Sequence, residues 1–229
     1  MTRHVRMVHL LLMTGLALAL AAPAGAAKFE DARIFIEYNS TDNDLGFHVS
    51  FDAENWRTVS ILNPAGAPIF QVTGKGPFGA LGMSELFTEG AEPSLDDVPL
   101  VVLLGMMREG QYTIRGVTVD GKTLMSKAML SHAVPAGPVV STSVNGNEVV
   151  ISWEPVTGPP DDFPARPIHI VGYQVIVEPF QITLPGSSTS MHLPQELIDA
   201  LGPGEHGFEV LAIDVSGNQT ITAGSFETE

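Results

Sequence analysis

Oxygen-bearing side chains gather in one short segment of the sequence. Asp42-Asn43-Asp44-Leu45-Gly46 places two aspartates one residue apart before a glycine, and Asn39 and Glu37 could add further oxygens. Ca²⁺ takes about six to eight oxygen ligands at close range, although this segment lacks the central glycine and the final glutamate of an EF-hand loop. The pattern therefore predicts either a calcium site built from Asp42, Asp44 and Asn39 or an Asx turn that joins two strands.

Two further groups of aspartates could do chemistry only if the fold assembles them. Asp161-Asp162 lies in a proline-rich loop, Glu154 to Pro167, whose prolines would lower the ordering cost of binding an ion. Its alternative is a solvated surface pair. Asp96, Asp97 or Asp161 could also act as the carboxylates of a hydrolase, and their spacing along the chain does not decide whether they meet.

Two common signatures of hydrolytic and metal sites are missing from the sequence. G-x-S-x-G and H-E-x-x-H do not occur, and the absence of cysteine excludes thiolate chemistry. After the first 26 residues there are five histidines, and none is paired at metal-ligand spacing. We expect those in predicted strands to face solvent. The five are His48, His132, His169, His192 and His206. The sequence therefore predicts a protein that is not an enzyme and has no resident cofactor.

The amino-terminal residues have the order of a secretory signal peptide. Arg3 and Arg6 make the start basic, Leu10 to Ala22 is almost wholly apolar, and Ala24-Gly25-Ala26 supplies an A-x-A cleavage site. We predict removal of residues 1–26. No cysteine follows that could carry a lipid, and no later apolar run reaches the roughly 20 residues of a membrane span. The expected location is the periplasm of a bacterium or the outside of the cell.

The net charge of the chain limits the kinds of molecule that it can bind. The 229 residues carry 26 acidic and 11 basic side chains, for a formal net charge of −15. Such a field repels phosphate backbones, so nucleic acid is excluded as a partner. We expect an unidentified protein or glycan of the cell envelope instead, and no membrane insertion after signal cleavage.

The mature chain divides at a segment with the composition of a linker, Val134 to Pro138. This predicts an amino-terminal β-rich, Ig-like domain over residues 28–133 and a second domain over 139–229, each of sandwich size. In the first domain, the sequence pattern predicts strands over residues 33–38, 47–51, 56–62 and 68–72. Asp120-Gly121 predicts a hairpin between two more. Ser94 is the expected N-cap of one short helix that runs to Met107, and Gly74 to Gly82 is an expected structural loop.

In the second half, apolar residues alternate with polar ones along several runs. Ile151-Ser152-Trp153 followed by Gly172-Tyr173-Gln174-Val175 resembles strands B and C of a fibronectin type III domain. Leu201 to Ala212 resembles the E–F corner and strand F of that family. The resemblance covers about residues 138–227. The family usually has a corner tyrosine where this chain has Phe208, so the corner hydrogen bond of the tyrosine hydroxyl is lost.

As a whole, the chain also resembles exported bacterial proteins with no established activity. The predicted fold class is all-β, with two tandem Ig-like or fibronectin type III-like β-sandwiches, the first carrying one short helix. Because fibronectin type III modules mostly act as binding or spacer units, the resemblance implies a non-catalytic binding or structural protein of the bacterial envelope. The alternatives are a calcium-dependent binding or adhesion module that uses the 39–46 loop, and a hydrolase with carboxylates assembled by the fold.

Overall fold

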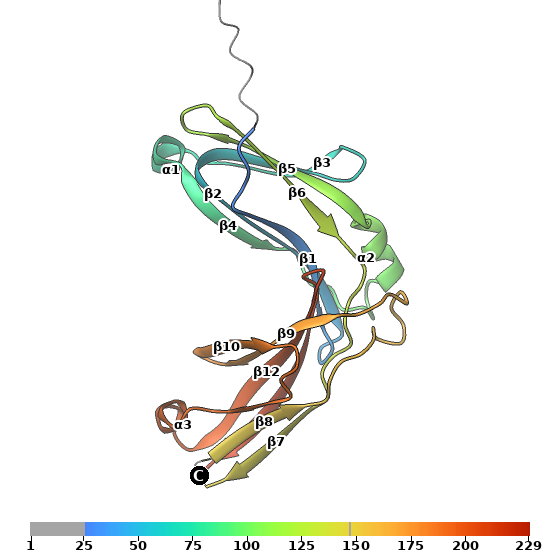
Figure 1. Cartoon of the computed structure of the whole chain (residues 1–229), viewed down its shortest axis with the longest axis vertical. Coiled ribbons are helices and arrows are strands. Elements are labelled where there is room, and N and C mark those ends of the chain that lie inside the picture. Colours follow the sequence, from blue (N-terminus) through green and yellow to red (C-terminus); the bar gives the residue numbers. More distant parts are fainter. Residues whose placement is uncertain (1–25, 147) are drawn as a thin grey trace, which may run out of the picture.

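The computed structural model describes residues 26–146 and 148–229. The predicted signal peptide, residues 1–26, therefore lies outside the described residues except for Ala26. The described chain is mostly β-strand, arranged as two sandwiches whose sheets are not closed into barrels (Figure 1). None of its helices combines the length and the apolar character that a membrane crossing requires.

The first sandwich contains six strands and two short helices: β1 (Asp31–Asn39), β2 (Asp44–Leu62), β3 (Pro68–Thr73), α1 (Gly76–Leu81), β4 (Met83–Glu89), α2 (Leu100–Met106), β5 (Gly110–Thr118) and β6 (Thr123–Leu130). The second contains seven strands and one helix: β7 (Val140–Asn145), β8 (Glu148–Trp153), β9 (Ile170–Val177), β10 (Phe180–Pro185), β11 (Ser190–His192), α3 (Gln195–Leu201), β12 (Gly204–Asp214) and β13 (Gln219–Thr228).

The long strand β2 organises the first sandwich. Its first part, Asp44–Asp52, pairs with β1 and β4, and its last part, Thr58–Leu62, pairs with β3 and β5. Between the two parts the register shifts, and Asn55 has a positive φ of 56°. Bulges of this kind bend a strand and increase its twist. Two runs that the sequence predicts as separate strands are thus one bent strand that belongs to both layers.

The core of the first sandwich forms where these layers face each other. Trp56 is fully buried, its ring lies 5.4 Å from that of Phe51, and its indole N–H donates to the Ser84 carbonyl at 2.8 Å. Ile36 of β1 and Ile114 of β5 are also fully buried. The alternation of apolar and polar residues in β1 and β5 follows from this burial, because successive side chains of a strand point to opposite faces.

Two local predictions for the first half were wrong. The residues from Ser94 form a turn, in which the Ser94 hydroxyl accepts from the Asp96 amide, and helix α2 begins only at Leu100. Pro99 accounts for the delay, because proline disfavours helical conformation in the residue before it. The glycine-rich segment contains the six-residue helix α1, for which Pro77 suits the first turn.

The second half is an Ig-like sandwich. A four-stranded layer in the order β10-β9-β12-β13 faces a three-stranded layer in the order β11-β8-β7. As the alternation predicts, each strand contributes every second side chain to the core: Val149, Ile151 and Trp153 from β8, Tyr173, Val175 and Val177 from β9, and Phe208, Val210 and Ala212 from β12. The Phe208 ring fills core space, which is the role left to it without a hydroxyl.

One sheet runs through both sandwiches. Strand β13 pairs with β12 on one side and, in parallel, with β1 of the first sandwich on the other, with Glu37 opposite Gln219 and Asn39 opposite Ile221. The result is a single ten-stranded sheet, and Figure 1 shows β1 reaching down to the red strands of the second half. The predicted linker, residues 134–138, contains no helix or strand, and its Val134 is fully buried. The predicted domain limits themselves stay a prediction.

Candidate metal centre

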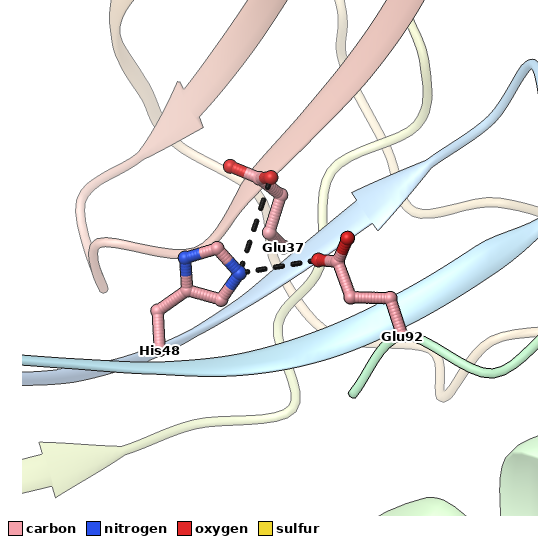
Figure 2. Close-up of side chains that lie close together, drawn as sticks. All are labelled: Glu37, His48 and Glu92. Carbon is pink, nitrogen blue, oxygen red and sulfur yellow. Dashed lines mark hydrogen bonds and ion pairs between the residues drawn. The ribbon is translucent and has the colours of Figure 1, made fainter. Parts of the chain in front are cut away.

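Three side chains from the first half meet beside the β1–β13 junction: Glu37, His48 and Glu92. The Nε2 atom of His48 lies 3.2 Å from Oε1 of Glu92 and 3.9 Å from Oε1 of Glu37 (Figure 2). One ligand atom of each residue lies within 4.8 Å of the other two. Within residues 26–146 and 148–229, no other three histidine or acidic side chains come together in this way.

The strand pairing places two of the three residues. His48 of β2 stands opposite Phe35 of β1, and Glu37 is two residues further along β1. Side chains two apart share a face of a sheet, and diagonal neighbours on that face are within reach of long side chains. This face is opposite to the one that carries Ile34 and Ile36 into the core. The glutamate and the imidazole are therefore diagonal neighbours outside the main core.

A glycine makes room for the third residue. Glu92 follows the end of β4, and its side chain lies over Gly46, which pairs with Glu37 in the ladder between β1 and β2. A Cβ atom added to Gly46 would lie 2.4 Å from Oε1 and 2.7 Å from Cγ of Glu92. These distances are too short for any Cβ contact. Glu92 reaches His48 only because residue 46 has no side chain.

The cluster is largely shielded from water. The side-chain exposure is 3% for His48, 16% for Glu37 and 29% for Glu92. The rings of Phe35 and Phe87 lie 5.1 Å and 5.5 Å from the imidazole. The second ring nitrogen of His48, Nδ1, is buried and has no hydrogen-bond partner in the described part of the chain. The expectation that His48 faces solvent was wrong, because Phe35, Phe87 and Glu92 cover the polar face on which it stands.

Burial also sets the electrostatics of the two glutamates. It is the largest cause raising the pKa of Glu37, with opposing contributions from the Gln219 hydrogen bond and from His48. Burial likewise raises the pKa of Glu92, and the charge of neighbouring Glu89 adds to this increase. Both carboxylates are thus held where negative charge is unfavourable without a counter-charge. A bound cation would supply that counter-charge.

The loop predicted to bind calcium forms an Asx turn. Oδ1 of Asn39 accepts from the amides of Thr41 at 3.0 Å and Asp42 at 3.2 Å, and its Nδ2 donates to Asp42 at 3.0 Å. Asp44 lies nearby, and its pKa is raised by burial and by the charge of Asp42. The turn alternative therefore describes the hydrogen bonding of this loop, while calcium binding by Asp42, Asp44 and Asn39 stays a prediction.

The fold brings the other predicted aspartates to the same region. Asn43 of this loop, Asp96 of the segment before α2, and Asp161 with Asp162 of the proline-rich loop line one cavity of about 340 Å³. The Asn43 side chain links two of these segments, since it accepts from the Tyr38 hydroxyl at 3.1 Å and donates to Asp96 at 3.3 Å. Asp97 is not among the lining residues. Of the loop predicted to bind calcium, only Asn43 reaches this cavity, and the predicted ligands Asn39, Asp42 and Asp44 are not among its lining residues.

Two glycine-containing segments resemble phosphate-binding loops in sequence but not in structure. Gly74 to Gly79 leads into α1, which is only six residues long. Gly116 to Thr123 has the P-loop spacing of glycine, lysine and threonine, yet it is the turn of the β5–β6 hairpin, with Gly121 at a φ of 84°. A P-loop needs a helix after the glycines, whose first amides hold the phosphate. Neither segment provides one of useful length.

Comparison with known proteins identifies no family. No family model matches the chain, and no curated protein sequence matches it. Of the solved structures, the spore cortex lytic enzyme SleM of Clostridium perfringens has a TM-score of 0.33 at 17% identity, over 44% of this chain and 29% of that one. A 1.5-MDa bacterial ice-binding adhesin, studied for retention at the host cell surface, has a TM-score of 0.29 at 14% identity, over 89% and 64%.

A tetra-tandem repeat from the extending region of a large adhesion protein has a TM-score of 0.28 at 14% identity, over 87% of this chain and 50% of that one. The chain thus spans less than two thirds of the length of each of these structures. Since every TM-score lies below 0.5, none of these likenesses bears on what the chain does.

Proposed function

We propose that the protein is an exported, non-catalytic binding or structural module of the bacterial envelope, located in the periplasm or outside the cell. The observation that carries the proposal is the parallel pairing of β1 with β13, which joins two sandwiches into one sheet. Two sandwiches that share a sheet hold the two ends of the molecule at a fixed separation. This suits a spacer, or a module that presents loops and strand edges to a partner.

The second sandwich supports the type III resemblance. Strands β8, β9 and β12 stand where strands B, C and F of a fibronectin type III module would stand, with the E–F corner before Phe208. The layers of three and four strands have the arrangement of such a sandwich. We therefore propose that residues of about 138–227 form a type III-like module, in which the Phe208 ring replaces the corner tyrosine.

Strand β7 is the surface on which binding is most directly tested. Among the described residues it pairs with β8 alone, at the edge of the three-stranded layer, and its residues from Ser141 to Asn145 are exposed. Exposed edges accept an added strand through their free backbone groups, and a lysine on the edge blocks such pairing. Val144 is 37% exposed on this strand, so Val144→Lys should leave the fold intact.

The test is an affinity capture with the immobilised protein and an envelope extract of its own host. A partner that the wild type retains and Val144→Lys loses would support edge binding. Val215→Lys, at an exposed valine of a loop in the same sandwich, serves as the control. The same preparations should not turn over generic ester, phosphate or glycan substrates. Turnover that disappears in Asp96→Asn would contradict the non-catalytic proposal.

A second candidate function is calcium-dependent binding or adhesion through the 39–46 loop. It is favoured by the cavity at which Asn43, Asp96 and Asp161 meet, because these side chains come from three separate segments. Calcium bound there would raise the melting temperature, since a ligand of the native state stabilises it. No shift at millimolar Ca²⁺ would rule this candidate out. A shift that Asp42→Asn of the loop or Asp161→Asn of the cavity removes, and that Asp199→Asn on helix α3 retains, would support it.

A further inference from the structure

We propose that Glu37, His48 and Glu92 bind a divalent first-row transition-metal ion, for which Zn²⁺ is the probe. The ion would tie the segment after β4 to the strands at the β1–β13 junction. This inference goes beyond the proposed function and does not depend on it, because the binding of a partner and the binding of a metal are measured separately.

The distances fit a tetrahedral ion. Zinc lies about 2.0–2.2 Å from nitrogen and oxygen ligands, so neighbouring ligand atoms of a tetrahedron are about 3.3–3.5 Å apart. Nε2 of His48 is 3.2 Å from Oε1 of Glu92 and 3.9 Å from Oε1 of Glu37. The shorter distance already lies close to that range, and a small rotation of the Glu37 side chain would bring the longer one into it. Three protein ligands would leave a fourth position open.

The ligand types select the class of metal. One neutral imidazole and two carboxylates suit zinc and its first-row neighbours, whereas Ca²⁺ requires about six to eight oxygens and is poorly served by imidazole. Two carboxylates also cancel the charge of a divalent ion. The half-buried Glu37 and Glu92 lack a lysine or arginine partner in the described residues, so the ion would supply the missing positive charge.

Neighbouring residues hold the ligands in position. The Gln219 amide of β13 donates to Oε2 of Glu37, which leaves Oε1 directed at His48. Such second contacts orient carboxylate ligands. The rings of Phe35 and Phe87 flank the imidazole and fix its plane, since Nδ1 has no acceptor to do so.

The chain also offers a matched control. His192 and Glu148, in the second sandwich, approach to the same 3.2 Å, but both are more than 60% exposed. No third acidic or histidine ligand joins them in the described part of the chain. If any close histidine–glutamate pair bound zinc, this pair would bind it as well. Glu148→Gln therefore tests whether the three-residue site is needed.

The experiment is calorimetric titration of ZnCl₂ into the tag-free protein after treatment with a chelator. We expect one ion per chain. Glu92→Gln and Gly46→Ala should each weaken binding by at least about 100-fold, because even the loss of a residue that only orients a ligand costs about 10–100-fold. Gly46→Ala acts by displacing the Glu92 side chain. Glu148→Gln should bind as the wild type does, and the circular dichroism of each variant checks its fold.

Thermal unfolding gives an independent readout. At a free Zn²⁺ concentration of 100 times Kd, the melting temperature should rise by about 5–10 °C, and Ca²⁺ at the same concentration should not reproduce this rise. Glu89→Gln removes a neighbouring charge without removing a ligand, so zinc should still raise the melting temperature of this variant. The proposal is overturned if the wild type binds no stoichiometric zinc, if binding survives both Glu92→Gln and Gly46→Ala, or if Glu148→Gln abolishes it.

Discussion

Asn218, just before β13, accepts a hydrogen bond from the backbone amide of Ile36 in β1 at 2.8 Å. Its Nδ2 atom donates to the carbonyls of Ser131 at 2.8 Å and Ala133 at 3.0 Å. The residue is fully buried. One amide side chain thus satisfies three backbone groups in two segments, strand β1 and the residues after β6 that lead into the second half. It stands beside the β1–β13 pairing that makes the two sandwiches one sheet.

We predict that Asn218→Ala lowers the free energy of unfolding by about 3 kcal/mol or more. The change would leave a buried amide and two carbonyls without their partner, and each buried unsatisfied group costs about 1–3 kcal/mol. Urea unfolding measures the loss. Asn145→Ala on the exposed strand β7, where the side chain makes one 3.4 Å hydrogen bond within the described part of the chain, should change stability by less than about 0.5 kcal/mol. Similar losses in both variants would contradict this role for Asn218.

A related prediction concerns cooperativity. Because the sandwiches share a sheet and the Asn218 contacts, the wild type should unfold in a single transition. Trp56 reports on the first sandwich and Trp153 on the second, so Trp153→Phe and Trp56→Phe isolate the fluorescence of each. Within each variant, the midpoint from tryptophan fluorescence should coincide with the midpoint from circular dichroism, which reports on both sandwiches, and the two should separate when Asn218→Ala is added. Midpoints of the two probes that already differ without that change would show that the junction does not couple the sandwiches.

The second sandwich was predictable from sequence because its strands alternate regularly. Val149, Ile151 and Trp153 point the same way, and the structure places all three in the core. The first half was harder because the apolar pattern breaks at Asp52 to Asn55, where β2 bends but does not end. Burial of the apolar runs fixes where strands lie, whereas a bulge depends on local backbone geometry that leaves little trace in composition.

The candidate site was harder still to foresee. Glu37 and His48 lie in strands that the sequence predicts, yet their proximity depends on the register between β1 and β2. Glu92 follows an unpredicted strand, and it contacts His48 across 44 positions of sequence. Gly46 appears in the sequence only as the end of an acidic turn. Its actual role, to leave space for Glu92, becomes visible only when both residues are placed.

The two tryptophans should respond differently to the same substitution. Both are buried, but the Trp56 indole N–H donates to Ser84, whereas that of Trp153 has no partner in the described residues. Trp56→Phe and Trp153→Phe remove the same atoms, so the difference between them isolates the hydrogen bond. We expect Trp56→Phe to cost about 1 kcal/mol more in the free energy of unfolding. Chemical unfolding followed by circular dichroism measures both, and equal losses would refute the expectation.

An ion pair should make stability depend on acid pH. Glu109 bonds to Arg166 at 2.7 Å and accepts from the His132 amide at 2.7 Å, and the Arg166 hydrogen bond is the largest cause lowering the Glu109 pKa below its usual 4.5. A carboxyl with a depressed folded pKa stabilises the protein fully above its unfolded pKa and loses this effect as pH falls through the folded pKa. The pair is partly exposed, so the contribution is about 0.5–1 kcal/mol.

The corresponding test compares Glu109→Gln with the wild type by thermal unfolding across pH. The variant should melt lower at pH 7, and the difference should shrink as the pH drops below about 4.5, where the unfolded chain takes up a proton at Glu109, and be lost once the pH falls through the lowered pKa of the folded state. Added salt should also reduce the difference, since exposed charges are screened. Glu154→Gln, at an exposed glutamate of the proline-rich loop, is the control. A difference that stays constant from pH 7 to pH 3 would show that charge is not its cause.

Two glycines in the β12–β13 ladder should respond in opposite directions to alanine. Gly224 stands opposite Phe208, and a Cβ atom there would lie 2.4 Å from Cζ of the phenylalanine ring. Gly207 pairs with the adjacent Ser225, and a Cβ atom there meets nothing within 4 Å. Gly224→Ala should therefore cost about 1–3 kcal/mol by overpacking. Gly207→Ala should be neutral or stabilise by up to about 1 kcal/mol, because it restricts the unfolded chain.

Urea unfolding of the two variants decides the point, because both add one methyl group to the same pair of strands. A loss confined to Gly224→Ala means that the Phe208 ring lies over the glycine and occupies the space above the sheet. Adding Phe208→Leu to Gly224→Ala should then recover part of that loss, since the smaller side chain removes the clash. Equal effects of the two alanines would mean instead that the ring can move aside, and that the glycine is not required for the packing of the second sandwich.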